Sequence, residues 1–343
     1  MQRRVTAPGP LLDGQGRLTE PGWASSLVKQ YERDKIKKSA LRVKEWDYYC
    51  VVSDRYALAL TVADNGYMGL DSVSLMDFDE RWETTRSRMC VLPLGKRGLP
   101  ATSEKGDIHV QGKDYEIAFR NDGKTRRLVG HMDNFRDGAP ILFDLTLSRS
   151  PRDSMVIMTP FREDPRAFYY NQKINCLAAS GSAVIGGREY LFAPAHSFGV
   201  LDWGRGVWTY ENTWYWGSAS GLADGAPFGF NLGYGFGDTS AASENMLFYE
   251  GIAHKLNRVT FDIPMKDGKE DYLAPWRVRD DQGRLNLDFA PILDRSANMD
   301  FKLLLSDQHQ VFGRFTGTAV LDNGKQVRVR ELAGFAEKVH NRW

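Results

Sequence analysis

The feature that most constrains the fold is a succession of short β-rich runs that begins after residue 38 and continues to the end of the chain. The runs are typically about 8–14 residues apart and are separated by turn signals, a spacing typical of barrels and sandwiches. No run of about ten or more residues in the middle of the chain keeps a helical period, which argues against alternating strands and helices around a parallel sheet. The sequence therefore predicts an all-β fold.

Individual runs show the period of two that a strand requires. Residues 46–52 alternate between two sets of side chains, and Val327 and Val329 alternate with Arg328 and Arg330. The second pattern is typical of a strand with one buried and one solvated face. Turns are expected where Asn-Gly or Asp-Gly accepts positive φ, at 64–66, 121–123, 266–268 and 322–324.

The chain of 343 residues is longer than one hydrophobic core usually supports, so two packed units are expected. Residues 1–20 are rich in proline, glycine and polar groups and are expected to form a loose arm. Apolar side chains within 22–38 approximate one helical face and predict a short helix. We expect this N-terminal arm and short helix over 1–38, a first antiparallel β-barrel or sandwich unit over 39–163 and a second over 164–343, with barrel closure removing exposed strand edges.

Composition excludes several classes of function. Lysine and arginine total 45 against 44 acidic residues, so the net charge of +1 argues against a nucleic-acid partner. The chain contains no apolar run long enough for a signal peptide or a membrane span, and a cytoplasmic location is expected. The widely spaced Cys50, Cys90 and Cys176 are expected to be reduced and mostly buried. Without a CxxC pair, a close histidine cluster or a nucleotide-binding loop, neither a metal nor another cofactor is expected. The sequence leaves the oligomeric state open.

The segment richest in chemical groups runs from Phe198 to Tyr249. It holds four of the nine tryptophans, many glycines and several carboxylates. Rigid aromatic surface, glycine where a backbone needs close approach, and a few carboxylates are typical of a ligand pocket. A tightly packed β-core uses the same residue types, so both interpretations stay open.

Glycine recurs at period two in residues 233–237, which leaves one strand face bare and able to accept an aromatic ring or a ligand. If strands 206–218 and 227–237 are neighbours, this bare face lies opposite aromatic side chains. A cavity or cleft is then expected there, with at least one of Asp202, Asp238 and Glu244 on its wall.

These three carboxylates are the candidate catalytic acids. A carboxylate beside indole rings is desolvated, which raises its pKa towards the range useful for acid–base chemistry. Each has a structural alternative: an ion pair with Arg205 for Asp202, a turn cap for Asp238 and a strand cap for Glu244. The candidate ligand-binding residues are Trp203, Arg205, Trp214, Tyr215, Trp216, Asn231, Tyr234, Asn245 and His196; the histidine is either a proton carrier or a structural residue.

Several motifs together carry a family resemblance. They are KEWDYY at 44–49, DWGRG at 202–206 with WYWGS at 214–218, NLG at 231–233 with GFGD at 235–238, EN at 244–245, and GFAE at 334–337 with NRW at 341–343. With these motifs the chain resembles the domain-of-unknown-function family 2804 from Gly22 to Trp343, a family whose name carries no activity. The aromatic C-terminal end is expected to dock near the tryptophan-rich segment.

More distantly, the two-part all-β organisation is similar to tandem lipocalin-like proteins, which include carotenoid 1,2-hydratase and Diels–Alderase-type enzymes. This resemblance implies an internal cavity for a largely apolar small molecule and, in some members, an acid residue.

The sequence favours a hydratase, lyase or isomerase that binds an apolar or amphipathic molecule between two β-units. Asp202 or Glu244 would donate a proton, and the aromatic walls would stabilise positive charge. A non-catalytic carrier of a lipid-like molecule and a carbohydrate-active protein stay open as alternatives. A buried unpaired carboxyl would favour an enzyme, whereas an open aromatic cleft with two carboxylates about 5–10 Å apart would favour sugar chemistry.

Overall fold

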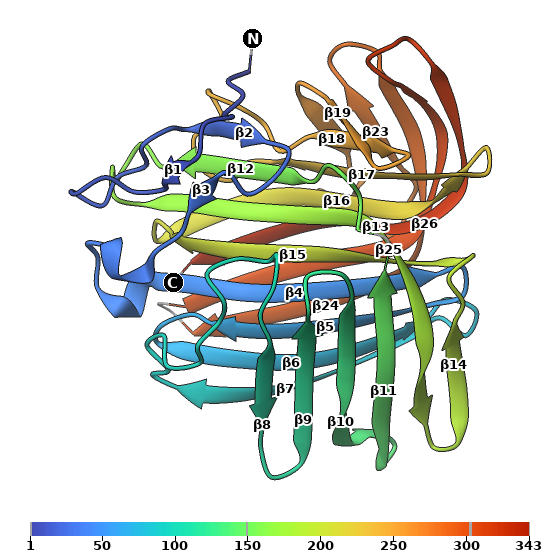
Figure 1. Ribbon diagram of the computed structural model, residues 1–343. Helices are drawn as coiled ribbons and strands as arrows, with labels where there is room; N and C mark the ends of the chain where they lie inside the picture. Colours follow the sequence, from blue (N-terminus) through green and yellow to red (C-terminus); the bar gives the residue numbers. More distant parts are fainter. Residues whose placement is uncertain (1, 149, 302–303, 343) are drawn as a thin grey trace.

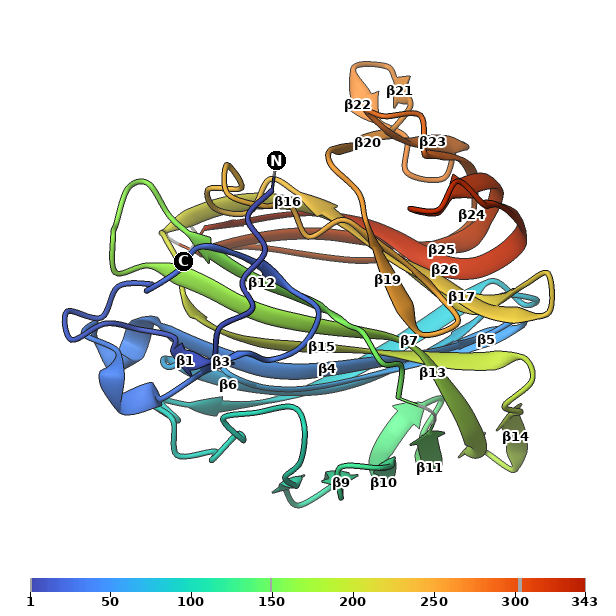
Figure 2. The same cartoon turned by 45° about the horizontal axis from the view of Figure 1, so that its top comes forward.

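The computed structural model describes residues 2–148, 150–301 and 304–342 and is almost entirely β-structure (Figure 1). Strands account for 64% and helices for 2%, which confirms the predicted all-β class. Two large, curled antiparallel sheets pack against each other. Figure 2 shows the second sheet, coloured yellow to red, lying over the long blue strands of the first.

The first sheet contains thirteen strands within the described residues. They are β2 (Gly22–Ala24), β4 (Val43–Ser53), β5 (Tyr56–Asp64), β6 (Met68–Asp77), β7 (Trp82–Val91), β8 (Ile108–Gln111), β9 (Tyr115–Asn121), β10 (Arg126–Arg136), β11 (Ala139–Ser148), β12 (Met155–Pro160), β13 (Phe168–Ile185), β14 (Arg188–Phe192) and β15 (Ser197–Val207). The main path is β7-β6-β5-β4-β15-β13-β11-β10-β9-β8; β12 and β14 also pair with β13, and β2 pairs with β12. The sheet curls back on itself, so that the Arg136 guanidinium on β10 lies 3.4 Å from the ring centroid of Trp82 on β7.

The second sheet contains nine strands in the part of the chain that the structure describes, in the order β19-β18-β17-β16-β26-β25-β24-β23-β20. They are β16 (Glu211–Ala223), β17 (Ala226–Tyr234), β18 (Met246–Tyr249), β19 (Ile252–Lys255), β20 (Val259–Asp262), β23 (Trp276–Asp280), β24 (Leu285–Phe301), β25 (Leu304–Val320) and β26 (Gln326–Arg342). Two small pairs complete the fold: β1 (Gly9–Pro10) with β3 (Lys29–Gln30), and β21 (Met265–Lys266) with β22 (Lys269–Glu270).

The chain passes from the first sheet to the second between Val207 and Glu211. The boundary expected between residues 163 and 164 does not coincide with this change, because it falls in the turn that joins β12 to β13 inside the first sheet. The turn residues at 162–165 are a stronger local signal than the short connection that changes sheets.

The N-terminal segment differs from the prediction. The short helix expected over 22–38 is replaced by β2, β3 and a 3₁₀ turn at Arg33–Lys35; a second 3₁₀ turn follows at Ala40–Arg42. The expected loose arm is docked, with Val5, Leu11 and Leu12 buried in the first core. The backbone groups of β12 would otherwise form an unpaired edge, and β2 satisfies them by pairing along it.

The local turn and strand predictions are confirmed. The turns at 64–66, 121–123, 266–268 and 322–324 each connect two paired strands. Val327 and Val329 are buried and Arg328 and Arg330 are exposed. The cysteines are free; Cys50 and Cys176 are buried, whereas Cys90 is exposed on β7.

The long strands are buried on both faces, because one face packs on the core of its own sheet and the other face packs against the other sheet. On β4, Tyr49 and Val51 enter the core of the first sheet, whereas Tyr48 and Cys50 face the second sheet. The second sheet has its own core around residues such as Phe289. Two apolar clusters, one around Phe312 and Phe335 and the other around Tyr169 and Phe236, join the sheets.

Bulges change which residues point between the sheets. Asn175 and Cys176 together oppose one residue of β15, and Cys176 adopts a φ of +62°. Arg330 and Glu331 form a similar bulge on β26, where Glu331 has a φ of +48°. An extra residue in one strand exchanges its two faces beyond that point. As a result, Val329 lies in the second core while Phe335 faces the first sheet.

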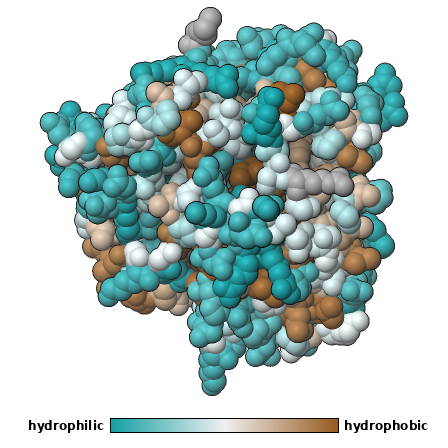
Figure 3. Space-filling model, viewed as in Figure 1, coloured by the Kyte–Doolittle hydropathy of each residue, from teal (hydrophilic) through white to brown (hydrophobic). Residues whose placement is uncertain are grey.

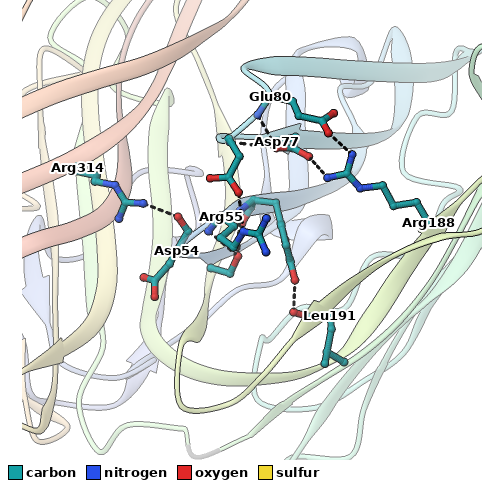
Figure 4. A network of polar contacts seen from close by, with 10 residues as sticks. Asp54, Arg55, Asp77, Glu80, Arg188, Leu191 and Arg314 are labelled. Atoms are coloured by element: carbon teal, nitrogen blue, oxygen red, sulfur yellow. Dashed lines mark hydrogen bonds and ion pairs between the residues drawn. The ribbon is translucent and has the colours of Figure 1, made fainter.

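Polar contacts at the surface connect the two sheets and their turns (Figure 4). Arg314 on β25 donates a hydrogen bond of 2.6 Å to the backbone oxygen of Asp54, in the turn between β4 and β5. Arg188 on β14 donates to Asp77 at 2.9 Å and to Glu80 at 2.6 Å. The face of the molecule seen in Figure 3 is mainly hydrophilic, with hydrophobic residues scattered over it.

Gly204 provides a direct test of how the sheets are packed. A Cβ at this position would lie 1.9 Å from the indole of Trp46, which covers the glycine from β4. We expect Gly204→Ala to lower the free energy of unfolding by about 1–3 kcal/mol or more, since the indole must move. Gly14→Ala is the control, because nothing lies within 4 Å of its added Cβ. Urea unfolding of both variants is the measurement, and equal stabilities would contradict this packing.

Candidate functional site

A group of polar side chains lies between the two sheets, among the apolar clusters that join them. This inter-sheet polar layer consists of Asn171, Lys173 and Asn175 on β13, Asp202 on β15, Ser218 on β16, Asn231 on β17, Gln310 on β25, Glu337 on β26 and Glu244 in the loop before β18. All are buried except Glu244, which is partly buried. Buried polar groups need partners, so the contacts within this layer determine its chemistry.

Lys173 provides a buried positive charge in the layer. Its Nζ lies 2.8 Å from Asp202 Oδ2 and 4.0 Å from the ring centroid of Trp216. Asn171 Nδ2 donates a hydrogen bond of 2.6 Å to Asp202 Oδ1, so both carboxylate oxygens have a partner. The ion pair between Asp202 and Arg205, which the sequence offered as an alternative, does not form. The two side chains point to opposite faces of β15, where Asp202 pairs with Lys173 and Arg205 pairs with Asp47.

Glu337 is a buried carboxyl held from two sides. Its Oε1 accepts a hydrogen bond of 2.9 Å from Trp214 Nε1, and its Oε2 accepts one of 2.8 Å from Gln310 Nε2. Burial raises the pKa of Glu337 to about 7, against the opposing effects of the Trp214 hydrogen bond and the Lys173 charge. Both protonation states are then populated near neutral pH, which is the requirement for a general acid or base.

Glu244 occupies the bare glycine face that the sequence indicates. A Cβ on Gly233 would lie 2.6 Å from Glu244 Cδ, so the glycine makes room for a carboxyl group. Asn231 Nδ2 donates to the backbone oxygen of Glu244 at 2.9 Å and to its Oε2 at 3.3 Å. Burial raises the pKa of Glu244, and the Lys173 charge and the Asn231 hydrogen bond oppose this effect.

Asn231 also links Glu244 to the aromatic wall, because its Oδ1 accepts a hydrogen bond of 2.7 Å from Trp216 Nε1. Three rings contact residues of the layer directly: Tyr48 through Gln310, Trp214 through Glu337, and Trp216 through Asn231 and Lys173. The layer therefore combines titratable carboxyls with rigid aromatic surface.

Two amide oxygens in the layer accept no hydrogen bond from the described residues. Asn171 Oδ1 and Asn175 Oδ1 are buried without a hydrogen-bond partner in the described part of the chain. A buried acceptor without a partner is costly, so both oxygens favour a bound hydroxyl or other donor.

A surface cleft opens near the layer. Its volume is about 570 Å³, and its walls include Phe161, Thr213, Gly235, Gly237 and Asp238. β16 and β17 are neighbours, which is the condition under which the sequence predicts a cleft. Asp238, one of the three candidate carboxylates, lies on the wall of this cleft. A recess of about 460 Å³, lined partly by Trp208, shares Glu163, Thr209 and Glu211 with this cleft.

Asp238 lies at the cleft rather than in the polar layer. Its carboxylate accepts hydrogen bonds from the Arg162 guanidinium at 2.8 and 3.1 Å. Together with the backbone N–H of Ser240, this partner holds the pKa of Asp238 well below its usual range. The structure therefore brings together Asp202, Glu244, Trp214, Trp216 and Asn231 from the candidate residues, and separates Asp238 from them.

Trp203 and Arg205 lie on the opposite face of β15. Trp203 is fully buried in the first core, where it packs edge to face with Tyr31 and Tyr170. Arg205 is fully buried and pairs with Asp47 at 2.9 Å. Their environment is that of core residues.

The remaining candidates also lie outside the layer. Tyr215 and Tyr234 stack at 4.5 Å against the second core. Asn245 connects strands, because its Oδ1 accepts from the Gly233 backbone N–H at 2.7 Å. His196 lies in an exposed turn, 3.9 Å from Asp54.

The sequence interpretation did not propose Lys173 or Glu337 as site residues. Lys173 is a charged residue in the otherwise apolar and amide-rich stretch 168–178, and this contrast could have identified it. The expected docking of the C-terminal end is confirmed for residues up to Arg342, because β26 pairs with β16 and places Glu337 beside Trp216. Trp343 lies outside the described residues.

Among the described side chains, no group of three or more His, Cys, Asp or Glu residues is placed to hold a metal ion. Nor does any helix in these residues have the length and apolar character needed to cross a membrane.

Comparison with known proteins identifies the family. The family described as Domain of unknown function (DUF2804) matches residues 2–343, so the chain belongs to it, as the sequence motifs predict. No curated protein matches the sequence.

Solved structures share the fold at low sequence identity. A candidate AttH of Nitrosomonas europaea is 14% identical with a TM-score of 0.56, covering 90% of this chain and 97% of its own. Kievitone hydratase from Nectria haematococca is 9% identical with a TM-score of 0.51, covering 97% and 98%. CghA, solved with Sch210972, is 12% identical with a TM-score of 0.49, covering 97% of each chain. The first two matches confirm the expected two-part all-β architecture.

The ion pair at the centre of the layer has a measurable consequence. Lys173→Met leaves the Asp202 carboxylate buried without its cation, and we expect a loss of about 3–5 kcal/mol in the free energy of unfolding. Adding Asp202→Asn removes the unpaired charge, so the double variant should lose less than the sum of the two single losses. Urea unfolding of the four proteins measures this coupling.

The exposed pair Arg277–Asp288 is the matched control, with side chains that are 64% and 72% exposed. Its coupling should stay below about 1 kcal/mol. Additive effects at Lys173 and Asp202 would show that this pair contributes nothing to the packing of the sheets.

Proposed function

We propose that this member of the DUF2804 family binds a largely apolar or amphipathic small molecule at the inter-sheet polar layer and acts on it as a hydratase, lyase or isomerase. The observation that carries the proposal is the buried Glu337 carboxyl, whose pKa is raised to about 7 beside the indole of Trp214. An acid with this pKa supplies and regains a proton near neutral pH.

In the direction of hydration, protonated Glu337 transfers its proton to one carbon of a substrate double bond. The π electron pair forms the new C–H bond and leaves positive charge on the adjacent carbon. The face of the Trp214 indole stabilises this charge. Water then attacks that carbon, and ionised Glu244 takes the proton that the water loses.

In an isomerisation, Glu244 would instead take a proton from a neighbouring carbon, so the same two carboxyls serve both reactions.

The charges of Lys173 and Asp202 supply a fixed electrostatic field around these carboxyls. The Lys173 charge favours the ionised forms of Glu244 and Glu337 and limits how far burial raises their pKa values. The unpaired oxygens of Asn171 and Asn175 support binding of a hydroxyl group or water nearby. The fold shared with kievitone hydratase is compatible with this class of reaction, although fold alone does not assign it.

A carrier is the second candidate. The internal pairing of Lys173 with Asp202, and the two hydrogen bonds that Glu337 accepts, are also what a purely structural layer would contain. Sugar hydrolysis has less support. Asp238, the candidate carboxyl in the open cleft, is held ionised by Arg162 and lacks the raised pKa of a glycosidase acid.

The proposed reaction predicts a specific loss in Glu337→Gln, which keeps the shape of the side chain and removes the transferable proton. Native mass spectrometry of the protein purified from its host identifies the retained molecule, which then serves as substrate in ²H₂O. We expect wild-type protein to incorporate deuterium or add water, and Glu337→Gln to be slower by about 10²–10⁴-fold.

Glu45→Gln is the matched control, because Glu45 is also buried but lies on the face of β4 that points away from the polar layer. There it accepts a hydrogen bond from Tyr31 and pairs with Arg33. It should retain the wild-type rate. Retention of the ligand without any turnover by the wild type would instead support the carrier.

The raised pKa of Glu337 also predicts a pH dependence of stability. The folded pKa of about 7 lies above the ordinary glutamate value of 4.5, so the folded state holds the proton more tightly. The resulting stabilisation is fully present below pH 4.5 and is lost as the pH rises from there through 7. We expect the free energy of unfolding of the wild type, measured relative to Glu337→Gln, to fall by about 2–3 kcal/mol between pH 5 and pH 8. Urea unfolding at the two pH values is the measurement. A pH-independent difference would refute the raised pKa.

A further inference from the structure

Phe236 lies between the surface cleft and the polar layer. Its neighbours Gly235 and Gly237 line the cleft, whereas its own side chain is buried, with 6% of the residue exposed. The ring centroid lies 4.9 Å from that of Tyr169 and 5.4 Å from that of Trp214. Because Trp214 donates a hydrogen bond to Glu337, Phe236 and one indole separate the cleft from the candidate acid.

The Phe236 ring is held by packing alone. It contacts Phe161 and Trp208 as well, at 5.3 and 4.9 Å between ring centroids, and a phenyl ring forms none of the hydrogen bonds that hold Trp214. The flanking glycines adopt φ values of +92° and +67°, a backbone conformation that glycine tolerates best. A Cβ on Gly235 would lie 2.8 Å from the Thr213 backbone oxygen. The glycines therefore allow the closely packed backbone path that places the ring between the cleft and Trp214.

We propose that the cleft is the entrance to the inter-sheet layer and that Phe236 is the gate residue that determines the size of the molecule admitted. This inference rests on the proposed function in one respect, since it takes the inter-sheet layer as the ligand's destination. Displacement of the Phe236 ring connects the cleft to the indoles of Trp208 and Trp214 and, behind them, to Glu337.

The two sides of the gate indicate the chemistry of the ligand. The inner side presents aromatic faces, which suit an apolar body. The rim outside the gate is polar and includes the paired Arg162 and Asp238, together with Asn212 and Asn257. Arg258 also lines the rim, exposed, and its guanidinium makes no ion pair or hydrogen bond within the described residues. The structure thus fits an amphipathic molecule whose apolar end enters first and whose polar end stays in the cleft.

The test uses the amphipathic fluorophore 1-anilinonaphthalene-8-sulfonate, so that it requires neither the natural ligand nor turnover. Phe236→Ala should bind one molecule per chain, saturably and about tenfold or more tightly than the wild type, because truncation opens the gate. Phe236→Leu is a milder variant that should show a smaller gain. Near-ultraviolet circular dichroism must show native packing, since loosely packed states bind this fluorophore nonspecifically.

Two controls locate the effect. Phe289→Ala removes an equally large buried ring from the second core, away from the cleft, and should bind the fluorophore like the wild type. Asn212→Trp, added to Phe236→Ala, fills the cleft and should abolish the gain. Equal binding by the Phe236 and Phe289 variants, no binding by either Phe236 variant, or a gain that survives the filled cleft would overturn the proposal.

The outcomes also separate this proposal from the proposed function. Tighter binding by Phe236→Ala together with full activity of Glu337→Gln would support the entrance and contradict the proposed role of Glu337. Loss of activity in Glu337→Gln without tighter fluorophore binding by Phe236→Ala would support the proposed reaction and contradict the proposed entrance.

Discussion

Burial of charge between two sheets is the constraint on which the rest of the structure depends. Lys173 enters this interface with its charge, and the chain compensates it with Asp202, with the face of Trp216 and with the nearby carboxyls of Glu244 and Glu337. A charge in such a position is costly unless it is paired and hydrogen-bonded. The charges of Lys173, Lys255 and Arg295 do not fully offset the effect of burial, which raises the pKa values of Glu244 and Glu337. The same burial that accompanies packing of the sheets therefore raises the pKa of Glu337 to about 7.

The polar layer exists because the long strands serve two cores. β13 and β26 each contain a bulge, at Asn175–Cys176 and at Arg330–Glu331, where the side-chain alternation reverses. Without the second bulge, Glu337 would have the same parity as Val329 and would point into the second core. With it, the carboxyl faces the first sheet and meets Trp214 and Gln310. A local irregularity thus decides which residues can act together.

Glycines in the interface make room for side chains of different sizes. Gly204 makes room for the indole of Trp46, whereas Gly233 makes room for the carboxyl of Glu244. Gly235 and Gly237 hold Phe236 between the outer cleft and the inner rings. The glycines of this interface therefore have different roles, which depend on the side chains that face each of them.

The sequence by itself determined the all-β class, the turns such as Asn65–Gly66 and the docking of the C-terminal strand. These features follow from local alternation, turn chemistry and composition, which are properties of neighbouring residues. The place where the chain changes sheets, the docking of the N-terminal segment and the set of residues in the polar layer were decided only by the tertiary structure. Trp203 and Trp216 look equivalent in the sequence, yet one enters the first core and the other faces Lys173. The physical reason is that the direction of a strand side chain depends on register, on bulges and on which sheet covers each face, and these are properties of distant segments brought together by folding.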